Sequence, residues 1–384
     1  MVAAVKSVPR ELRARGSIFV RACAYLILED GAVFEGTRIG APVEAAGEVV
    51  FTTSMTGYQE VISDPSYRGQ IVVMAAPLIG NYGFNPQAWE ACGPHVRGFV
   101  VREACEVPSH YLSREPLDEF LAGHGIPGLT ELDTRRLVRH LRIHGLKRGM
   151  ISGSADQSTI DRVRDLPELD EQDLVGEASC KEPIVIPGDG PRIALLDCGV
   201  KLGIVDALRR RGCEVHVLPH TTGPEAIAAF EPGGVLLSNG PGDPAVLSSV
   251  VATVRDIIDN IPVMGVCLGH QLLALAVGGR TYKMKFGHRG SNQPVLDQLT
   301  GRVMITTQNH GYAVDPDTLP SSVEVTHVNL NDGTIEGLRH RHLPVFSVQF
   351  HPEGRPGPHD ADHLYDEFLD AIGARTEVTH AEAR

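Results

Sequence analysis

Cys267 is the residue of this chain whose surroundings most clearly favour chemistry. It lies in the run Gly265-Val266-Cys267-Leu268-Gly269, directly after the apolar stretch 261–264. This G-x-C-x-G pattern is typical of the sharp strand-to-helix turn that lifts a nucleophile above a sheet. A helix that begins at Leu268 would point its positive end at the sulfur, and its first N–H could donate to a developing oxyanion. The alternative is a cysteine buried only for packing, and the motif alone leaves both interpretations open.

A second candidate group lies far downstream, in the run His351-Pro352-Glu353 after the apolar stretch 345–350. A histidine can take the proton of a thiol and return it to a leaving group, and an acid can orient and charge-stabilise the imidazole. By itself, His351 could equally be a strand-end histidine with a structural hydrogen bond. Together with Cys267, it indicates acyl transfer through a thioester, provided that the fold brings the two together.

Two polar loops could complete such a site. The run 238–244, Ser-Asn-Gly-Pro-Gly-Asp-Pro, follows the apolar stretch 234–237. Its glycines allow backbone N–H groups to converge on an anion or carbonyl, although an ordinary turn is the commoner outcome. The run 308–312, Gln-Asn-His-Gly-Tyr, could recognise a substrate or only cap a turn. No G-x-x-x-x-G-K-[ST] motif occurs, so the sequence predicts no phosphate cradle for ATP.

The elements that would position these groups change character along the chain. From Arg192 on, short apolar strands alternate with helices, which predicts an α/β domain with a mixed, mostly parallel sheet flanked by helices. Ligands bind beyond the carboxyl ends of such strands, where Cys267 and His351 fall. The first half, with a predicted hairpin at 24–34, indicates an α+β domain. The proline- and glycine-rich run 182–191 separates the two as a linker.

The composition excludes several function classes. A chain of 384 residues is long enough for two domains, and its net charge of −13 disfavours nucleic acid or an anionic membrane as a partner. Seven cysteines without a C-x-x-C pair fit reduced thiols in a cytoplasmic protein. No apolar run is long enough to span a membrane. His359 and His363 have the spacing of a helical metal pair, but without further ligands we expect no metal. Residues 1–21 lack the apolar core of a secretion signal and are predicted to be a disordered extension.

These stretches resemble the signatures of the class I (triad) glutamine amidotransferases, namely an S-N-G-P-G-D-P-like loop, a G-x-C-x-G-H-Q elbow and a terminal H-P-E. The resemblance narrows to the small subunits of carbamoyl-phosphate synthetase. It is carried by Lys283-Met284-Lys285-Phe286-Gly287-His288-Arg289-Gly290, by the run 308–312, and by the run 47–60 with Asp64-Pro65-Ser66-Tyr67 after it. It extends from about Ala24 to Phe368. The implied division is an N-terminal domain at 22–181 that docks a large subunit, the linker, and an amidotransferase domain at 192–384.

The resemblance implies that glutamine is hydrolysed and that the ammonia passes to an ATP-using large subunit, which makes carbamoyl phosphate from bicarbonate for pyrimidine and arginine synthesis. Cys267 would be the nucleophile, with His351 and Glu353 completing the triad. The amides of Gly242 and Leu268 would form the oxyanion hole. The implied glutamine contacts are Ser66, Gly240, Gly242, Leu268, Gln271, Asn309, Gly311 and Tyr312. No cofactor is expected on this chain, because ATP, Mg²⁺ and bicarbonate belong to the large subunit. The expected assembly is a heterodimer or a higher oligomer of it.

Three alternatives compete with this interpretation. A catalytically silent scaffold would lack the cysteine, which is present. A stand-alone hydrolase of γ-glutamyl bonds, or the glutaminase of another pathway, would not need the N-terminal domain. The chain also departs from the family at Leu202-Gly203, where the usual pattern is Phe-Gly-x-Lys-x-Asn-Ile and the sequence here is Cys198-Gly199-Val200-Lys201-Leu202-Gly203-Ile204. This departure leaves the contacts at the start of the first helix open.

Overall fold

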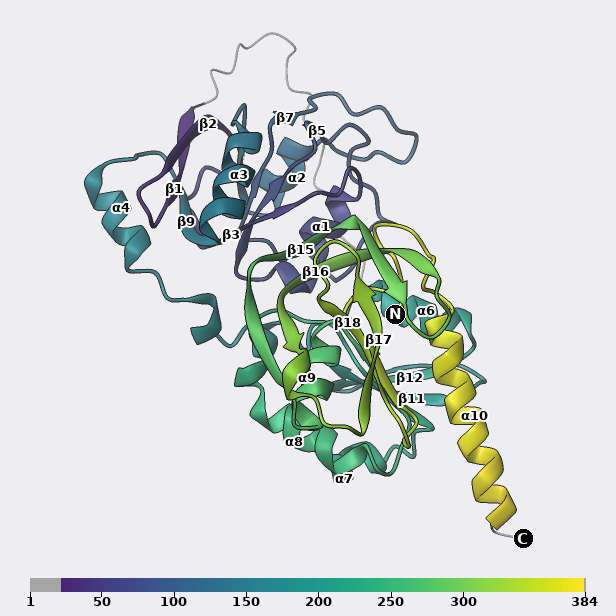
Figure 1. Cartoon of the computed structure of the whole chain (residues 1–384). Coiled ribbons are helices and arrows are strands. Elements are labelled where there is room, and N and C mark those ends of the chain that lie inside the picture. Colours follow the sequence, from purple (N-terminus) through teal and green to yellow (C-terminus); the bar gives the residue numbers. More distant parts are fainter. Residues whose placement is uncertain (1–21, 383–384) are drawn as a thin grey trace.

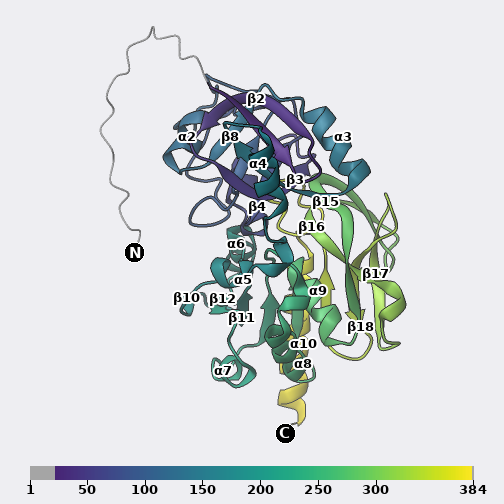
Figure 2. The same ribbon diagram turned by 90° about the vertical axis from the view of Figure 1, so that its left-hand side faces the viewer.

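The structure, a computed structural model, describes residues 22–382. The extension predicted at 1–21 lies outside the described residues. Figure 1 shows two bodies, an upper one built from the first half of the chain and a lower one built from the second half. Figure 2, turned by 90°, shows the same two bodies in contact along one broad face.

The upper body is a closed barrel in which the strands follow one another in the order β1-β2-β8-β6-β4-β3-β9. Their bounds are β1 (Cys23–Leu28), β2 (Val33–Gly40), β8 (Pro127–Thr130), β6 (Gly98–Val100), β4 (Gln70–Met74), β3 (Ala45–Thr52) and β9 (Lys147–Ser152). Strands β1 and β2 pair antiparallel, which confirms the predicted hairpin. Leu137 and Leu141 of helix α3 (Thr134–His144) pack into the barrel core against Leu26. The expectation of an α+β body is confirmed.

The lower body is built on a ten-stranded sheet in the order β10-β12-β11-β13-β14-β19-β18-β17-β15-β16. Strands β12, β11, β13, β14 and β19 are parallel, and the remaining pairs are antiparallel. The bounds are β10 (Ile184–Ile186), β12 (Glu214–Pro219), β11 (Arg192–Asp197), β13 (Gly234–Leu237), β14 (Val263–Val266), β19 (Val345–Val348), β18 (Ile335–His340), β17 (Val323–Asn329), β15 (Arg280–Asp297) and β16 (Val303–Asp315). The predicted mixed sheet is confirmed.

Helices cover both faces of the parallel strands because alternate side chains of a strand point to opposite faces. On one face, Ile193 and Leu195 of β11 pack with residues of α6 (Leu202–Arg210) and α10 (Leu364–Glu382). On the other face, Ala194 and Leu196 pack with α8 (Ser248–Ile257) and α9 (Leu268–Ala276). The other helices are α1 (Tyr58–Ser63), α2 (Leu117–Gly123), α4 (Gln157–Arg164), α5 (Leu174–Ala178) and α7 (Pro224–Ala228), and β5 (Leu78–Ile79) pairs with β7 (Glu103–Ala104) in a small separate sheet.

Backbone and side-chain contacts join the two bodies along β15. Thr53 donates from its backbone N–H to the carbonyl of Arg289 at 3.1 Å, and Leu146 donates to the carbonyl of Lys285 at 3.1 Å. Within the predicted linker, residues 184–186 form β10, which pairs antiparallel with β12 at the sheet edge. The division into domains at 182–191 stays a prediction.

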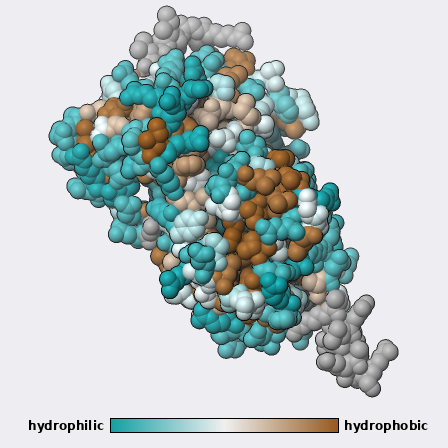
Figure 3. Space-filling view, in the orientation of Figure 1, coloured by the Kyte–Doolittle hydropathy of each residue, from teal (hydrophilic) through white to brown (hydrophobic). Residues whose placement is uncertain are grey.

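The surface carries one apolar area that stands out in Figure 3, where brown residues gather over the lower body in the region of β15 to β18. Among residues 22–382, no helix combines the length and the apolar character that crossing a bilayer requires.

Candidate active site

Cys267 occupies a strained turn between β14 and α9. Its backbone has φ 56° and ψ −103°, a positive-φ conformation that is strained for a residue with a side chain. The glycines on either side are required by close packing. A Cβ at Gly269 would lie 2.2 Å from the carbonyl oxygen of Leu237, and one at Gly265 would lie 2.6 Å from that of Gly269. The sequence thus places Cys267 at the first turn of α9, as the elbow motif predicts.

His351 is brought to Cys267 by the neighbouring strand. The N–H of Cys267 donates to the carbonyl of Val348 in β19 at 2.9 Å, and His351 lies three residues beyond that carbonyl. The Nδ1 atom of His351 is 2.7 Å from Oε1 of Glu353. A carboxylate can only accept, so Nδ1 carries a proton and donates it to this contact. Within the described residues, Nε2 makes no hydrogen bond of ordinary geometry. The Cys267 side chain nevertheless contributes to raising the pKa of the imidazole.

The electrostatics of this pair favour a charged imidazole. Burial lowers the pKa of His351, but the Glu353 carboxylate and the Cys267 thiol outweigh it and raise that pKa to about 10. Burial opposes ionisation of Glu353 as well, yet Lys201 and His351 hold the pKa of this carboxyl well below its usual range. An ionised acid beside a protonated imidazole is the state that this geometry stabilises.

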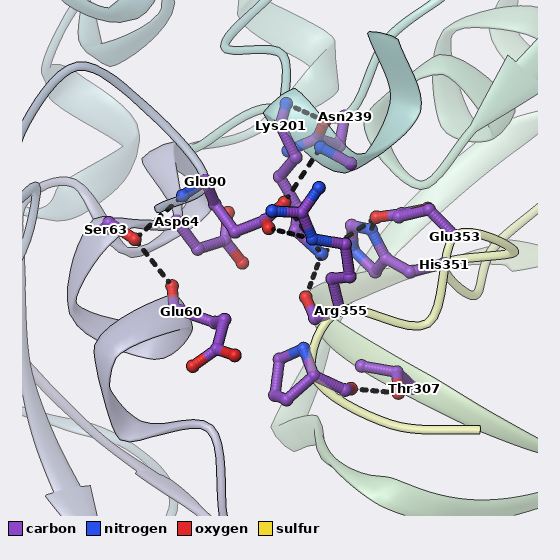
Figure 4. Close-up of polar contacts among 12 residues, drawn as sticks. Glu60, Ser63, Asp64, Glu90, Lys201, Asn239, Thr307, His351, Glu353 and Arg355 are labelled. Atoms are coloured by element: carbon purple, nitrogen blue, oxygen red, sulfur yellow. Dashed lines mark hydrogen bonds and ion pairs between the residues drawn. The ribbon is translucent and has the colours of Figure 1, made fainter. Parts of the chain in front are cut away.

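A cluster of buried charges lies next to His351, and Figure 4 shows its members. The Lys201 Nζ atom is 2.8 Å from Oε1 of Glu353 and 3.8 Å from Oε2 of Glu90, and it also donates to the backbone carbonyl of Arg355. The Nε atom of Arg355 is 2.7 Å from Oε1 of Glu90. Burial acts against the charge of Lys201, but Glu353 and Glu90 raise its pKa above the ordinary value. Because Glu90 belongs to the upper body, these contacts connect Glu353 to the N-terminal half.

The departure at Leu202-Gly203 is explained by Glu90. The N–H of Leu202 donates to the backbone carbonyl of Glu90 at 2.8 Å, and that of Gly203 donates to the Glu90 carboxylate at 3.1 Å. A Cβ at Gly203 would lie 2.9 Å from Cγ of Glu353 and 3.0 Å from Oε2 of Glu90. Glycine therefore lets a carboxylate from the other body approach the start of α6 and cap it.

A cavity opens beside Cys267 between the two bodies. The eight residues that the resemblance implies for glutamine all line it, together with Cys267. His351 and Glu353 are buried behind the sulfur and do not line the cavity. Ser66 comes from the upper body, and its Oγ accepts from Nδ2 of Asn239 at 2.9 Å. The cavity is therefore lined by residues of both halves.

Two backbone donors in this cavity lack acceptors. Within the part of the chain that the structure describes, the N–H groups of Gly242 and Leu268 make no hydrogen bond. Gly242 has φ +87°, a conformation that suits glycine. Unpaired donors at a helix start and a glycine turn can bind a developing negative charge.

Sequence reasoning missed the charged members of the site. Glu48, Lys283 and Arg289 line the cavity. Asp64 receives a hydrogen bond from Nδ2 of Asn309 at 2.9 Å. Asp64 and Arg289 lie inside stretches that carried the family resemblance, which was the available signal. Glu90 had no signal, because it lies in a loop far from the motifs in sequence.

One group of side chains could offer metal ligands. His288, His310 and Glu336 have ligand atoms within 4.8 Å of one another. Nδ1 of His288 lies 3.4 Å and Nε2 of His310 lies 4.0 Å from Oε1 of Glu336. The opposite ring nitrogens contact protein groups: Nε2 of His288 is 2.9 Å from Asp332, and Nδ1 of His310 is 2.8 Å from the carbonyl of Tyr312. His363, which has i, i+4 spacing from His359, contacts the backbone carbonyl of Asp360 through Nδ1 at 3.2 Å.

Comparison with known proteins matches both halves of the chain. Residues 194–371 match the family model described as glutamine amidotransferase class-I, and residues 26–151 match carbamoyl-phosphate synthase small chain, CPSase domain. The carbamoyl phosphate synthase small chain of Bacillus caldolyticus is 52% identical over 361 residues, which cover 93% of this chain and 99% of that protein. The chain belongs to the carbamoyl phosphate synthase small chain family. The small chain of Oceanobacillus iheyensis is 49% identical over 352 residues, which cover 91% of this chain and 96% of that one. The family is an enzyme family, and its amidotransferase part contains the elbow and both polar loops.

Proposed function

We propose that this chain hydrolyses glutamine through a covalent thioester on Cys267 and delivers the ammonia to a large subunit. The observation that carries the proposal is the position of Cys267. It stands on a strained elbow, with the His351–Glu353 pair on one side and a cavity lined by all the implied glutamine contacts on the other. This arrangement has the parts of a nucleophilic triad: a nucleophile, a base and an orienting acid.

In the first step, the Cys267 sulfur attacks the γ-carbonyl carbon of glutamine. The oxyanion accepts hydrogen bonds from the N–H groups of Gly242 and Leu268. The C–N bond then breaks, and His351 gives its proton to the nitrogen so that ammonia leaves. The thiol proton passes to His351 as the sulfur attacks, and the raised pKa of His351 favours the imidazolium that forms.

In the second step, water attacks the γ-glutamyl thioester. His351, now neutral, takes a proton from the water, and the same two N–H groups hold the second oxyanion. The C–S bond breaks, glutamate leaves, and the proton returns to the Cys267–His351 pair. Glu353 keeps the imidazole oriented throughout, because Lys201 holds this carboxylate in its ionised form.

The product of this chain is ammonia for a partner. The partner is a large subunit that combines the ammonia with bicarbonate and ATP to make carbamoyl phosphate, which feeds pyrimidine and arginine synthesis. Support comes from the family, whose relatives carry the printed name carbamoyl phosphate synthase small chain. ATP, Mg²⁺ and bicarbonate would bind to the large subunit, and no cofactor is needed here for hydrolysis. The seven unpaired cysteines support a cytoplasmic location.

The decisive variant is Cys267→Ser in the complex with the large subunit. Glutamine-dependent carbamoyl phosphate synthesis should fall by at least about 10³-fold, because the hydroxyl is a far poorer nucleophile here. Synthesis from added ammonia should persist, since it does not use the thiol. Normal glutamine turnover in the Ser variant would show that Cys267 is not the nucleophile.

Labelling gives an independent check on the same residue. A glutamine-shaped diazo-ketone should modify Cys267, and glutamine should protect it. The control is Cys180, whose pKa is raised to about 12 by burial and by the nearby Asp197 carboxylate. Mass spectrometry should find the label on Cys267 and not on Cys180.

Glutaminase activity of the isolated chain should be weak and should rise when the large subunit is added. If the chain is purified from native extract and no ATP-dependent, carbamoyl-phosphate-forming partner copurifies with it, the pathway assignment is wrong.

A further inference from the structure

Arg289 is a buried cation in the glutamine cavity that the proposed mechanism does not use. It lines the cavity together with Cys267 and is 5% exposed. Its backbone lies in β15 directly opposite Asn309 of β16, the residue whose carbonyl oxygen is 3.6 Å from the Cys267 sulfur. Arg289 is therefore held one strand away from the nucleophile.

The Arg289 guanidinium has few partners in the folded chain. A guanidinium carries five N–H donors, yet the side-chain hydrogen bond found here is from Nη1 to the carbonyl of Phe286 at 2.8 Å. Its Nε is buried without an acceptor. Among residues 22–382, no carboxylate lies within ion-pair distance of Arg289. Burial lowers the pKa of Arg289, and Glu48 acts on it only through its charge.

A buried arginine without an anion is costly, and an incoming anion would relieve that cost. Nη2 of Arg289 lies against Gly311, since a Cβ there would be 3.4 Å from it. Gly311 and Asn309 are both implied contacts of glutamine, so a substrate seated on them lies next to the guanidinium. Glutamine brings one anionic group, its α-carboxylate.

We propose that Arg289 binds the α-carboxylate of glutamine and thereby selects α-amino acids over simple amides. This inference rests on the proposed function. Arg289 is a specificity residue in it, because it contacts the end of the substrate that does not react. The outer cavity between the two bodies shares Glu48, Leu146, Leu169 and Lys283 with the glutamine cavity, so the two cavities adjoin at these residues.

The test compares three amides in the complete complex: glutamine, 4-aminobutanamide, which lacks only the α-carboxylate, and 4-carbamoylbutanoate, which lacks only the amino group. In Arg289→Met, the KM for glutamine should rise by about 10- to 100-fold, as expected for loss of a charge-assisted contact. The wild-type preference for glutamine over 4-aminobutanamide should shrink by the same factor. The preference for glutamine over 4-carbamoylbutanoate should stay unchanged, because both substrates carry the carboxylate and lose the same contact. Arg289→Lys should keep part of the preference, because it retains the charge without the planar fork.

Controls separate recognition from folding. Arg97→Gln removes a positive charge from the outer cavity only, and should change the KM for glutamine by less than about twofold. The rate of Cys267 alkylation by iodoacetamide should stay near that of the wild type in Arg289→Met, which tests the fold of the elbow independently. If Arg289 only holds the Phe286 carbonyl in place, all three amides should lose activity by the same factor, and that result overturns the proposal. A wild-type chain that fails to hydrolyse glutamine at all would instead overturn the proposed function.

Discussion

On the cavity side of Cys267, the groups supplied by the sequence motifs are glycines and neutral amides, whereas behind His351 the structure packs full charges. Gly240, Gly242 and the Leu268 N–H form the first region. Lys201, Glu353, Glu90 and Arg355 form the second. In the proposed reaction, the first region accepts a charge that exists only transiently, and fixed neutral donors suit that task. The second must hold a permanent charge on Glu353, so it needs a counter-ion within about 3 Å, as Lys201 provides at 2.8 Å.

The difference predicts that damage to the two regions has different consequences. Changes on the cavity side should lower turnover with little effect on stability, because they remove donors used in the transition state. Changes behind His351 should lower stability and shift its pH dependence, because they leave buried charges without partners. Three variants, Gly240→Ala, Lys201→Met and Glu90→Gln, test this distinction, and each is compared with a control variant.

The largest effect on turnover is expected for Gly240→Ala. A Cβ there would lie 2.2 Å from the carbonyl oxygen of Cys198 and 2.8 Å from Leu268, so the 238–244 loop must move away from α9. Separation of the Gly242 and Leu268 donors should lower kcat for glutamine by about 10²-fold or more. Ammonia-dependent synthesis by the complex should stay unchanged.

The matched variant is Gly242→Ala in the same loop. A new Cβ at Gly242 would lie 3.9 Å from the nearest atom, a Leu174 methyl, so it would not clash. Only the left-handed backbone, with φ +87°, is strained. That strain is about 1–2 kcal/mol, and kcat should fall by about tenfold or less. Equal losses in the two variants would show that steric displacement of the loop is not what lowers turnover.

The second variant, Lys201→Met, tests the charged region. It keeps the length of the side chain but leaves Glu353 and Glu90 buried without this cation, which should cost about 3–5 kcal/mol of unfolding free energy. Lys201 holds the pKa of Glu353 below its ordinary 4.5, so this stabilisation is complete above about pH 4.5 and declines below it. The deficit of the variant in urea unfolding should therefore be largest at neutral pH and smaller in acid.

A double variant shows whether the loss comes from unbalanced charge. Lys201→Met with Glu90→Gln removes one charge of each sign and should recover part of the lost stability. An additive loss in the double variant would mean that Lys201 acts through packing instead of through its charge.

The same contrast explains how far the sequence alone could reach. The elbow, the loop at 238–244 and the His351–Glu353 run are local patterns, and strand alternation places all three at the carboxyl ends of parallel strands. The mixed sheet and the barrel hairpin were predictable for the same local reasons. Glu90 was not, because its role depends on the contact between the two bodies. Arg289 lies in a stretch that carried the resemblance, but its place beside Asn309 follows from the pairing of β15 with β16. No periodicity in a sequence reports which loop of one body will cap the first helix of another.

The smallest effect is expected for Glu90→Gln, and it should appear as a change in unfolding free energy that depends on pH. Burial raises the pKa of Glu90 to about 7 from 4.5, although Lys201 and Arg355 oppose the shift. Between these two values the folded chain binds more protons than the unfolded chain, so the contribution of Glu90 to stability falls as the pH rises from about 4.5 to about 7. Glutamine resembles the protonated acid and does not titrate. The unfolding free energy of the variant relative to wild type should therefore increase across this window and level off above about pH 7. Glu177→Gln, an exposed acid paired with Arg68 at 3.0 Å, is the matched control and should give a nearly flat difference. If both variants give flat curves while kcat collapses in Glu90→Gln, the charged region behind His351 serves catalysis directly, and the distinction between the two sides of Cys267 fails.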